Sequence, residues 1–501
     1  MNGVGSYDTA VNNDTLANLS PRTAQYIAGK WIDRGDRDAI DVVDPATEQV
    51  VAAVPAATTA DVENALAAAE AGFAVWRRTG AWERSATLRR MADIIRADVD
   101  RFSRVMTAET GKPLAQSLGE VLSSVDQFDW YADEARRIYG RTVDGHSTDM
   151  RITVRREPVG PVAAFAAWNF PSLLPARKIA PALAAGCSLI VVPPVEAPLS
   201  ALLLAEAADL AGLPAGALNM ITGAPAPICA QLLASPIIRK VSLTGSVPVG
   251  VAINVAAAKT LKSVSMELGG HAPVLVFADA DPIAAGRAGA QGKFRNAGQV
   301  CIAASRFIVH ESIAAEFTAA FVAEASQLRL GPGRDPNSDM GPLVSAKRRA
   351  AIDDLVDDAV AKGAKLVCGG SRPTELPVGY YFAPTVLTDV TPQMRVMREE
   401  PFGPIAPITT FATYDEGISA ANATQFGLAA FVYTRDLGIA YRASEDLEAG
   451  MVGVNHLTVA TAEAPFGGVK ASGFGREGGT EGVEDYTYAK YVNMMLPGPR
   501  Q

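Results

Sequence analysis

The stretch PVAAFAAWNFPSLLPARKIAPALAAGCSLIVV, residues 161–192, decides the fold class of this chain. Two apolar runs, at 162–167 and 188–192, have the length of buried strands, and a helical pattern over 176–185 separates them. Strands that alternate with helices across short turns indicate parallel βαβ units, with helices on both faces of the sheet.

The same alternation continues outward from this stretch. Downstream it reaches residue 270, and a second alternating series runs from 273 to about 455. Two doubly wound α/β domains are therefore expected. In the first series the expected helices are 199–211 and 226–233 and the strands 217–221 and 240–243, and the second includes strands at 274–277, 306–310 and 429–433.

The two ends of the chain have different patterns. Residues 1–24 are expected to form a loose tail, and helical patterns dominate the segment that follows it. Near the C-terminus, 489–494 alternates weakly and is expected to pair as an edge strand elsewhere, including across a subunit boundary. The other expected elements are strands at 26–33, 50–54 and within 151–164, and helices at 61–75, 82–102 and 114–139.

Composition excludes several classes of protein. The 501 residues suffice for two or three domains, and a net charge of −9 argues against nucleic-acid or anionic-membrane partners. No apolar stretch reaches the ~20 residues of a membrane span. The four cysteines lack metal-ligand spacing. A cytoplasmic protein without a metal site is therefore expected.

One cysteine has a chemically informative context. The segment FRNAGQVCIAASR, residues 294–306, places Cys301 after a flexible glycine and at the edge of an expected helix. A thiol at a helix N-terminus ionises more readily, because it lies at the positive end of the helix dipole. The alternative is a small buried core residue, which is the usual fate of a free cysteine.

Two polar residues stand at the ends of apolar runs. Glu267, in MELGGHAP (266–273), is costly there unless it faces a cleft, is paired, or is kept neutral by a raised pKa. Asn169 ends a strand, and the strand ends of α/β sheets are where sites form. The alternatives are a helix cap or ion-pair partner for Glu267 and ordinary turn chemistry for Asn169.

Six motifs in a fixed order resemble the aldehyde dehydrogenase superfamily, over about residues 26–492. The interval of 34 residues between Glu267 and Cys301 also resembles that family. The resemblance implies two doubly wound α/β domains and a small β arm that bridges subunits in homodimers or homotetramers. It implies a dinucleotide-binding domain (25–140 and 159–270), a catalytic domain (271–465) and an oligomerisation arm (141–158 and 486–501). The motifs are WNFP (168–171), LTGS (243–246), ELGG (267–270), GQVC (298–301), EEPFGP (399–404) and PFGG (465–468).

The resemblance also implies a mechanism. Cys301 attacks the aldehyde carbon, and the side-chain amide of Asn169 and the backbone N–H of Cys301 bind the oxyanion, at roughly 3–4 kcal/mol per donor. Hydride transfer leaves a thioester, and Glu267 activates the water that hydrolyses it. Lys178 and Glu477 resemble family residues that form a proton relay behind Glu267, although a surface ion pair is the alternative.

The cofactor site departs from the family pattern at one end. The turn GSVPVG (245–250) opens a helix, where backbone N–H groups and Ser246 can bind a pyrophosphate, although an ordinary turn also explains it. The family commonly has a Lys at position 192 and a polar or acidic residue at 195, whereas this chain has Val192 and Val195. Without that cation, NAD is favoured over NADP. The other cofactor contacts that the resemblance implies are Ala167, Trp168, Thr244, Gly245, Gly250, Leu268, Glu400 and Phe402.

Two arginines suggest the substrate class. Arg177 and Arg295 fall where succinate-semialdehyde dehydrogenases have a carboxylate-binding pair, and guanidinium groups bind carboxylates bidentately. Thr461, beside Ala460 where that subfamily has Ser, and Phe466 complete the implied substrate site. A short carboxylated aldehyde such as succinate semialdehyde is therefore expected, and another anionic or an uncharged aldehyde is the alternative.

Two further functions compete with this interpretation. A CoA-acylating dehydrogenase characteristically lacks the water-activating Glu, which is present here as Glu267. A non-catalytic relative with weak cofactor binding is supported only by Val192 and Val195. The combination of Cys301, Glu267 and Asn169 argues against it.

Overall fold

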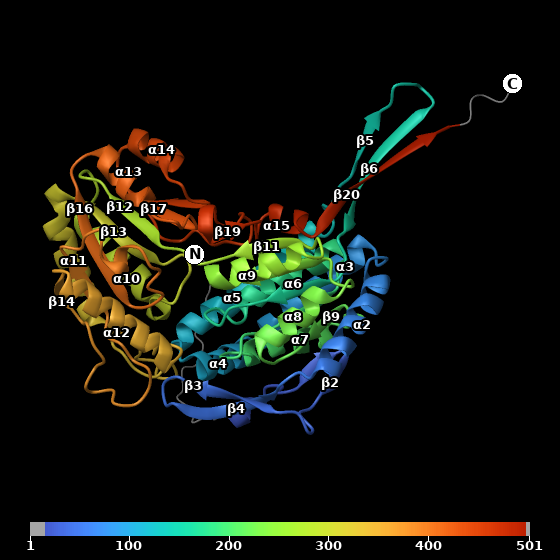
Figure 1. The fold of residues 1–501 in the computed structure, drawn as a ribbon, viewed down its shortest axis with the longest axis horizontal. Coiled ribbons are helices and arrows are strands. Elements are labelled where there is room, and N and C mark those ends of the chain that lie inside the picture. The colour runs from blue at the N-terminus through green and yellow to red at the C-terminus, as the bar shows by residue number, and fades with distance from the viewer. Residues whose placement is uncertain (1–15, 497–501) are drawn as a thin grey trace.

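The computed structural model describes residues 16–496; residues 1–15 and 497–501, which belong to the expected tail and arm, lie outside that description. Two large sheets, each with helices on both faces, form the body of the molecule, and a three-stranded arm projects from it (Figure 1). Part of the expected tail is ordered differently, since α1 (Leu16–Leu19) is a short helix.

The first sheet has eight strands in the order β19-β11-β10-β7-β8-β9-β1-β2. The five strands from β11 to β9 are parallel, and the remaining strands add antiparallel edges on both sides. The bounds are β1 (Gln25–Ile27), β2 (Lys30–Ile32), β7 (Val162–Phe165), β8 (Leu189–Val192), β9 (Leu218–Met220), β10 (Lys240–Thr244), β11 (Ser263–Glu267) and β19 (Gly473–Phe474).

Alternate residues of these strands enter two separate cores. Ala163 and Phe165 pack with helices α2, α8 and α9, whereas Val162 and Ala164 pack with α3 to α7. Because successive side chains of a strand point to opposite faces of the sheet, each face packs against its own set of helices. This is the arrangement that the pattern of residues 161–192 predicts. The bounds are α2 (Thr59–Trp76), α3 (Ala81–Ala97), α4 (Val99–Thr110), α5 (Leu114–Glu134), α6 (Leu173–Ala185), α7 (Leu199–Leu210), α8 (Pro225–Ala234) and α9 (Val247–Ala258).

The second sheet has seven strands in the order β14-β15-β16-β13-β12-β17-β18, of which only β14 is antiparallel to its neighbour. Its two faces pack against α10, α11 and α12 on one side and α13 and α14 on the other. The bounds are β12 (Ala272–Val276), β13 (Ala304–His310), β14 (Lys365–Cys368), β15 (Thr385–Thr388), β16 (Ile405–Phe411), β17 (Ala429–Tyr433), β18 (Met451–Val454), α10 (Pro282–Phe294), α11 (Ala314–Gln327), α12 (Ala346–Ala361), α13 (Tyr414–Asn422) and α14 (Leu437–Asp446).

In the arm, the last strand of the chain pairs with a strand from a much earlier part of the sequence. β20 (Thr487–Met495) pairs with β6 (Met150–Pro158) antiparallel along its whole length, and β5 (Arg141–Asp144) forms the other edge. In Figure 1 the arm extends away from both sheets. Just before it, α15 (Glu481–Glu484) follows β19. A separate hairpin joins β3 (Ala39–Asp44) to β4 (Gln49–Pro55).

One expected helix is interrupted. The pattern over 82–102 predicts a single helix, whereas α3 ends at Ala97 and α4 begins at Val99. Asp98, at φ −114° and ψ 23°, lies outside the helical region and turns the chain between them. Within residues 16–496, none of the helices has the length and apolarity that a membrane crossing requires.

Candidate active site

The parallel strands of the first sheet end at one edge, and several predicted residues gather there. Thr244 at the end of β10 pairs with Glu267 at the end of β11, and Phe165 at the end of β7 pairs with Val192 at the end of β8. Ligands bind at the carboxyl ends of the strands in such sheets. This edge is therefore the candidate active site.

Glu267 is a buried carboxyl group without a partner. Its residue is 4% exposed, and neither carboxylate oxygen forms a hydrogen bond within residues 16–496. Burial and then the charge of Glu477 raise its pKa well above the ordinary value. A Cβ on Gly467 would lie 2.8 Å from Oε1, so only glycine leaves room for this carboxyl group. Of the alternatives for Glu267, the raised pKa is the one the structure supports.

The expected helix at Cys301 is absent, and that prediction was wrong. Cys301 lies in a turn between the 3-10 helix Arg295–Gly298 and β13. Asn296 and Ala297 have φ of 50° and 52°, and Gly298 also has positive φ, so three left-handed residues turn the chain towards β13. Gly298 packs so closely on the carbonyl of Gly403 that a Cβ would lie 2.2 Å from that oxygen.

Cys301 is consequently not activated by a helix dipole. Burial, and then the charges of Glu267 and Glu400, raise the pKa of its thiol to about 12. Arg177 and the backbone N–H of Ile302 act in the opposite direction. In the free protein the thiol is therefore neutral at neutral pH and needs a group that accepts its proton.

Asn169 lies beside the Cys301 turn, although it does not end a strand as expected. It is 3% exposed and stands four residues beyond the end of β7. Its side-chain nitrogen donates to the carbonyl of Gln299 at 3.1 Å, two residues before Cys301. An amide NH2 has two hydrogens, so one remains for an oxyanion.

Lys178 and Glu477 form a buried ion pair rather than a surface one. The Lys178 Nζ donates to Glu477 Oε1 at 2.5 Å and to Ser242 Oγ at 3.2 Å. The second carboxylate oxygen of Glu477 has no partner among the described residues, and the charge of Glu477 raises the pKa of Glu267. The pair thus lies directly behind the carboxyl group of Glu267.

The two arginines approach Cys301 in different ways. Arg177 is 3% exposed and its guanidinium lies 4.0 Å from the ring centroid of Phe466, while its Nε has no partner among the described residues. Arg295 is exposed, and its guanidinium lies 5.7 Å from the ring of Phe170. Both charges interact with the thiol: Arg177 acts to lower the pKa of Cys301, and Cys301 opposes the desolvation that lowers the pKa of Arg295. Thr461 stands in an exposed loop.

The turn at residues 245–250 opens a helix, as expected. Ser246 precedes α9, and no side chain of the described residues caps that helix, so the N–H groups of Val247 and Val249 remain available, whereas Pro248 has none. Gly245 donates to the carbonyl of Glu267, and a Cβ on Gly250 would lie 2.6 Å from Leu268, which closes the turn onto β11. The available N–H groups at the start of α9 would fit a dinucleotide pyrophosphate.

The remaining residues of the predicted cofactor site form two groups. One includes the polar atoms of Thr244 and Glu400, and the other, at the end of β8, is apolar. Trp168 and Phe402 meet edge to face with centroids 5.4 Å apart, and Thr244 Oγ1 is buried without a partner among residues 16–496. Glu400 accepts the N–H of Gly270 at 2.9 Å, and burial raises its pKa to about 7. At the other end Val192 is buried, while Ala167 and Val195 are half-buried.

Sequence reasoning missed Lys112, Glu120 and Phe170, which surround Asn169. Lys112 lies in the short Gly–Lys–Pro connection between α4 and α5, where a lysine is normally exposed. The available signal was the spacing of eight residues between Lys112 and Glu120, which is weak without the fold.

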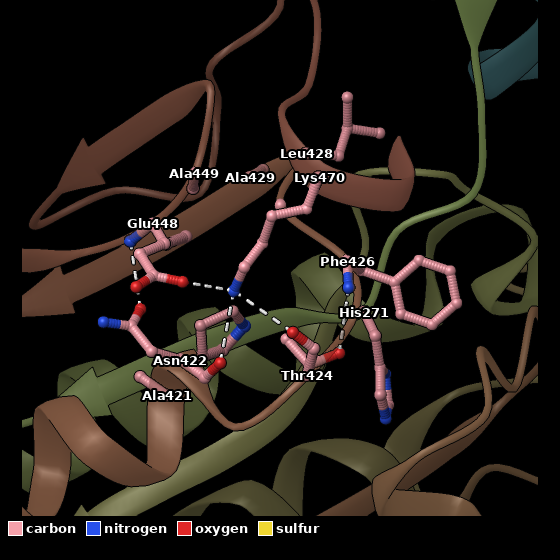
Figure 2. A pocket seen from close by; sticks show the side chains of 13 residues that line it. His271, Ala421, Asn422, Thr424, Phe426, Leu428, Ala429, Glu448, Ala449 and Lys470 are labelled. Atoms are coloured by element: carbon pink, nitrogen blue, oxygen red, sulfur yellow. Dashed lines mark hydrogen bonds and ion pairs between the residues drawn. The ribbon is translucent and has the colours of Figure 1, made fainter. Parts of the chain in front are cut away.

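A hollow elsewhere contains none of the predicted site residues. Figure 2 shows that Lys470 is its central cation, and Glu448 and the carbonyls of Asn422 and Thr424 already hold that ammonium. No group of three or more metal-ligating side chains occurs within the described part of the chain.

Comparison with known proteins matches this geometry to one family. The aldehyde dehydrogenase family profile covers residues 31–492. The chain belongs to the aldehyde dehydrogenase family. The 3-sulfolactaldehyde dehydrogenase of Pseudomonas putida is 45% identical over 467 residues, which cover 93% of this chain and 96% of the relative.

Other aldehyde dehydrogenases extend the comparison. The NADP(+)-dependent succinate-semialdehyde dehydrogenase of Escherichia coli (strain K12) is 41% identical over 475 residues, covering 95% of this chain and 98% of the relative. The crystal structure of betaine aldehyde dehydrogenase from Staphylococcus aureus in complex with NAD+ superposes with a TM-score of 0.94 at 34% identity, covering 97% of this chain and 98% of that one. The aldehyde dehydrogenase fold, with two α/β units, is thus established, and the family acts on small aldehydes with NAD(P).

Proposed function

We propose that this aldehyde dehydrogenase oxidises a short anionic aldehyde to the carboxylic acid, through a thioester on Cys301. The observation that carries the proposal is the guanidinium of Arg177. It is buried over Phe466, its Nε has no partner among the described residues, and its charge acts on both Cys301 and Glu267. A buried cation that has no ion-pair partner within residues 16–496 is costly, and a substrate anion would offset that cost.

The substrate class follows from the shape of this cation pair. Arg177 on Phe466 and Arg295 on Phe170 would hold a carboxylate or a sulfonate, both of which offer several acceptor oxygens. Relatives that act on 3-sulfolactaldehyde and on succinate semialdehyde support both anions. Thr461 and Phe466 would line the same chamber.

The chemistry would proceed from the residues around Cys301. The thiol of Cys301 would first lose its proton to solvent water, and the thiolate sulfur would then attack the aldehyde carbon while the free N–H of Asn169 stabilises the oxyanion. When bound, the dinucleotide accepts the hydride, and a thioester remains on Cys301. Glu267 then takes a proton from the attacking water, and Lys178 with Glu477 would carry it onward. The presence of Glu267 favours water over CoA as the acceptor.

Cofactor binding would involve the edge of the first sheet. Ser246 and the start of α9 would hold the pyrophosphate, and Gly245, whose N–H is already bonded to Glu267, would lie in the same turn. Thr244, Trp168, Leu268, Glu400 and Phe402 would surround the nicotinamide and its ribose. With Val192, Val195 and Ala167 at the other end, no lysine would meet a 2′-phosphate, and NAD would be preferred. In this scheme 25–140 with 159–270 forms the cofactor domain and 271–465 the catalytic domain, while the arm (141–158 and 486–501) joins subunits in a homodimer or homotetramer.

An aldehyde panel tests the substrate class. Succinate semialdehyde, 3-sulfolactaldehyde and uncharged butanal are assayed by the absorbance of NADH. In Arg177→Met and Arg295→Met, kcat/KM for the anionic aldehydes is expected to fall about 10- to 100-fold, because each loses a charge-assisted hydrogen bond. Butanal oxidation should fall less than oxidation of the anionic aldehydes, so the ratio of anionic to uncharged turnover should decrease.

Arg306→Met is the matched control for this test. Arg306 is also buried, but its guanidinium donates to the carbonyls of His271, Ala420 and Ala421. Its loss should lower the Tm without changing the ratio of anionic to uncharged turnover. An unchanged ratio in both Arg177→Met and Arg295→Met would overturn the proposed substrate class.

A further inference from the structure

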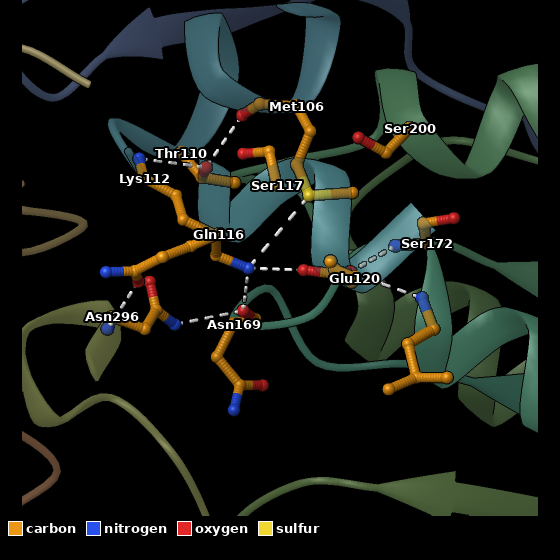
Figure 3. Close-up of polar contacts among 12 residues, drawn as sticks. Met106, Thr110, Lys112, Gln116, Ser117, Glu120, Asn169, Ser172, Ser200 and Asn296 are labelled. Carbon is orange, nitrogen blue, oxygen red and sulfur yellow. Dashed lines mark hydrogen bonds and ion pairs between the residues drawn. The ribbon is translucent and has the colours of Figure 1, made fainter. Parts of the chain in front are cut away.

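A buried ion pair lies close to the active site without belonging to the groups that react. The side chains of Lys112 and Glu120 are each 1% exposed, and the Lys112 ammonium contacts the Glu120 carboxylate (Figure 3). Charges buried in this way are costly unless further hydrogen bonds satisfy their remaining polar atoms. The hydrogen-bond partners of Lys112 and Glu120 therefore show which part of the backbone the pair holds in place.

Lys112 holds the backbone of the predicted oxyanion donor. Its Nζ donates to the carbonyl oxygen of Asn169 at 2.9 Å and lies 4.4 Å from the ring centroid of Phe170. The same carbonyl also accepts the side chain of Asn296 at 3.1 Å, from the turn that leads to Cys301. The Asn169 carbonyl is thus fixed from two sides, one in each half of the molecule.

Glu120 holds the other end of the same turn. Its Oε1 accepts the backbone N–H groups of Ser172 at 2.9 Å and Leu173 at 3.2 Å, where α6 begins. A carboxylate that accepts two N–H groups at a helix N-terminus also interacts favourably with the helix dipole. The two side chains together hold residues 169–173 at both ends.

We propose that Lys112 and Glu120 are a positioning pair for Asn169. They fix the backbone of the turn, so that the Asn169 amide stays anchored at Gln299 with one hydrogen directed to the oxyanion beside Cys301. The inference rests on the proposed thiol chemistry and adds two residues that contact no substrate. Lys112 acts on the carbonyl of Asn169, and Glu120 acts on the turn after it and on Lys112.

The test uses the full-length double variant K112M/E120Q. Removal of one partner alone would leave a buried unpaired charge and risk unfolding, whereas removal of both charges does not. The Gln retains an oxygen for Ser172 and Leu173, and Met fills the space beside Phe170. The variant therefore removes chiefly the bond to the Asn169 carbonyl.

Two assays report on the oxyanion donor. Oxidation of succinate semialdehyde and hydrolysis of p-nitrophenyl acetate both need attack by Cys301, and the ester needs neither the arginine pair nor NAD. We expect kcat to fall about 10- to 100-fold in both assays with KM nearly unchanged, because small displacements of a catalytic group have such effects. Alkylation of Cys301 by iodoacetamide should keep its rate, since the pair does not contact the thiol.

Glu109→Gln is the matched control. Glu109 is also a buried carboxylate at a helix N-terminus, where it accepts the N–H groups of Leu199 and Ser200 at the start of α7. That helix does not carry Asn169. The control should lower the Tm at least as much as K112M/E120Q and leave ester hydrolysis within about twofold of the wild type.

A double-mutant cycle separates positioning from general stability. In an Asn169→Ala background K112M/E120Q should cause no further loss of kcat, whereas a purely structural role would reduce it equally in both backgrounds. Equal losses, or full ester hydrolysis in K112M/E120Q, would overturn the proposal.

Amide hydrogen exchange decides the same question without turnover. Exchange of the peptide spanning residues 168–178 should accelerate in K112M/E120Q and not in Glu109→Gln, and unchanged exchange would also overturn the proposal. A wild-type protein that oxidises no aldehyde and hydrolyses no ester would instead refute the proposed function, while exchange still tests the pair.

Discussion

The edge of the first sheet differs between the end of β11 and the end of β8. At β11, Glu267 and the nearby Arg177 are buried with polar atoms that lack partners among residues 16–496. At β8, three strands and roughly 14 Å away by the usual strand spacing, Val192 is buried in an aliphatic core. Buried polar atoms without partners are thus found where bonds would change, whereas the residues predicted at the far end of the cofactor site, Ala167, Val192 and Val195, are apolar.

The largest effect should come from the polar end. Cys301→Ala is expected to lower aldehyde oxidation by more than about 1000-fold, because the nucleophile is lost and no thioester can form. Mass spectrometry of quenched wild-type enzyme should show an acyl adduct on the peptide containing Cys301, and the variant should show none. Substantial oxidation by Cys301→Ala would show that Cys301 is not the nucleophile, and the polar end of the sheet edge would then not be the place where bonds change.

Glu267→Gln should have the next largest effect, on hydrolysis alone. Because Glu267 would act as the water-activating base, steady-state turnover is expected to fall about 100-fold or more, while a rapid burst of one NADH per site persists. The Tm should not decrease, since the variant removes a buried carboxyl group that has no hydrogen-bond partner among residues 16–496. Loss of the burst would assign Glu267 to an earlier step.

The pH dependence of wild-type turnover follows from the same carboxyl group. Only the ionised form can accept a proton, and its pKa is raised by burial and by Glu477. Hydrolysis-limited turnover should therefore rise with pH through a range well above the ordinary pKa of a glutamate, and this dependence should vanish in Glu267→Gln. A wild-type profile that is flat above pH 5 would contradict the raised pKa.

The smallest effect belongs to the apolar end. Val192→Lys places a cation where the 2′-phosphate of NADP would lie, and it is expected to lower the KM for NADP about tenfold with little change for NAD. Steady-state kinetics with both cofactors measures the shift. If the wild type already has a KM for NADP far below that for NAD, the apolar side chains at this end do not determine which cofactor is preferred.

The βαβ order and the unusual setting of Glu267 were predictable, because they depend on local periodicity and on the cost of a carboxyl group in an apolar run, whereas the strand before Asn169 ends earlier than expected. The turn at Cys301 was not. It depends on left-handed backbone at Asn296 and Ala297 and on the contact of Gly298 with Gly403, a hundred residues away. The roles of Lys112 and Glu120 likewise require knowledge of which turn lies beside them.

The return of the chain end to the first sheet has a consequence for biosynthesis. β19 adds to β11 beside Glu267, Glu477 follows it, and β20 completes the arm only with residues 487–495. A nascent chain still held in the ribosome by its last segment lacks both the edge of that sheet and the partner of Lys178. Cys301 and Glu267 would thus both leave the ribosome before the ion pair of Lys178 and Glu477 can form, so that the proposed proton relay is the last part of the site to be assembled.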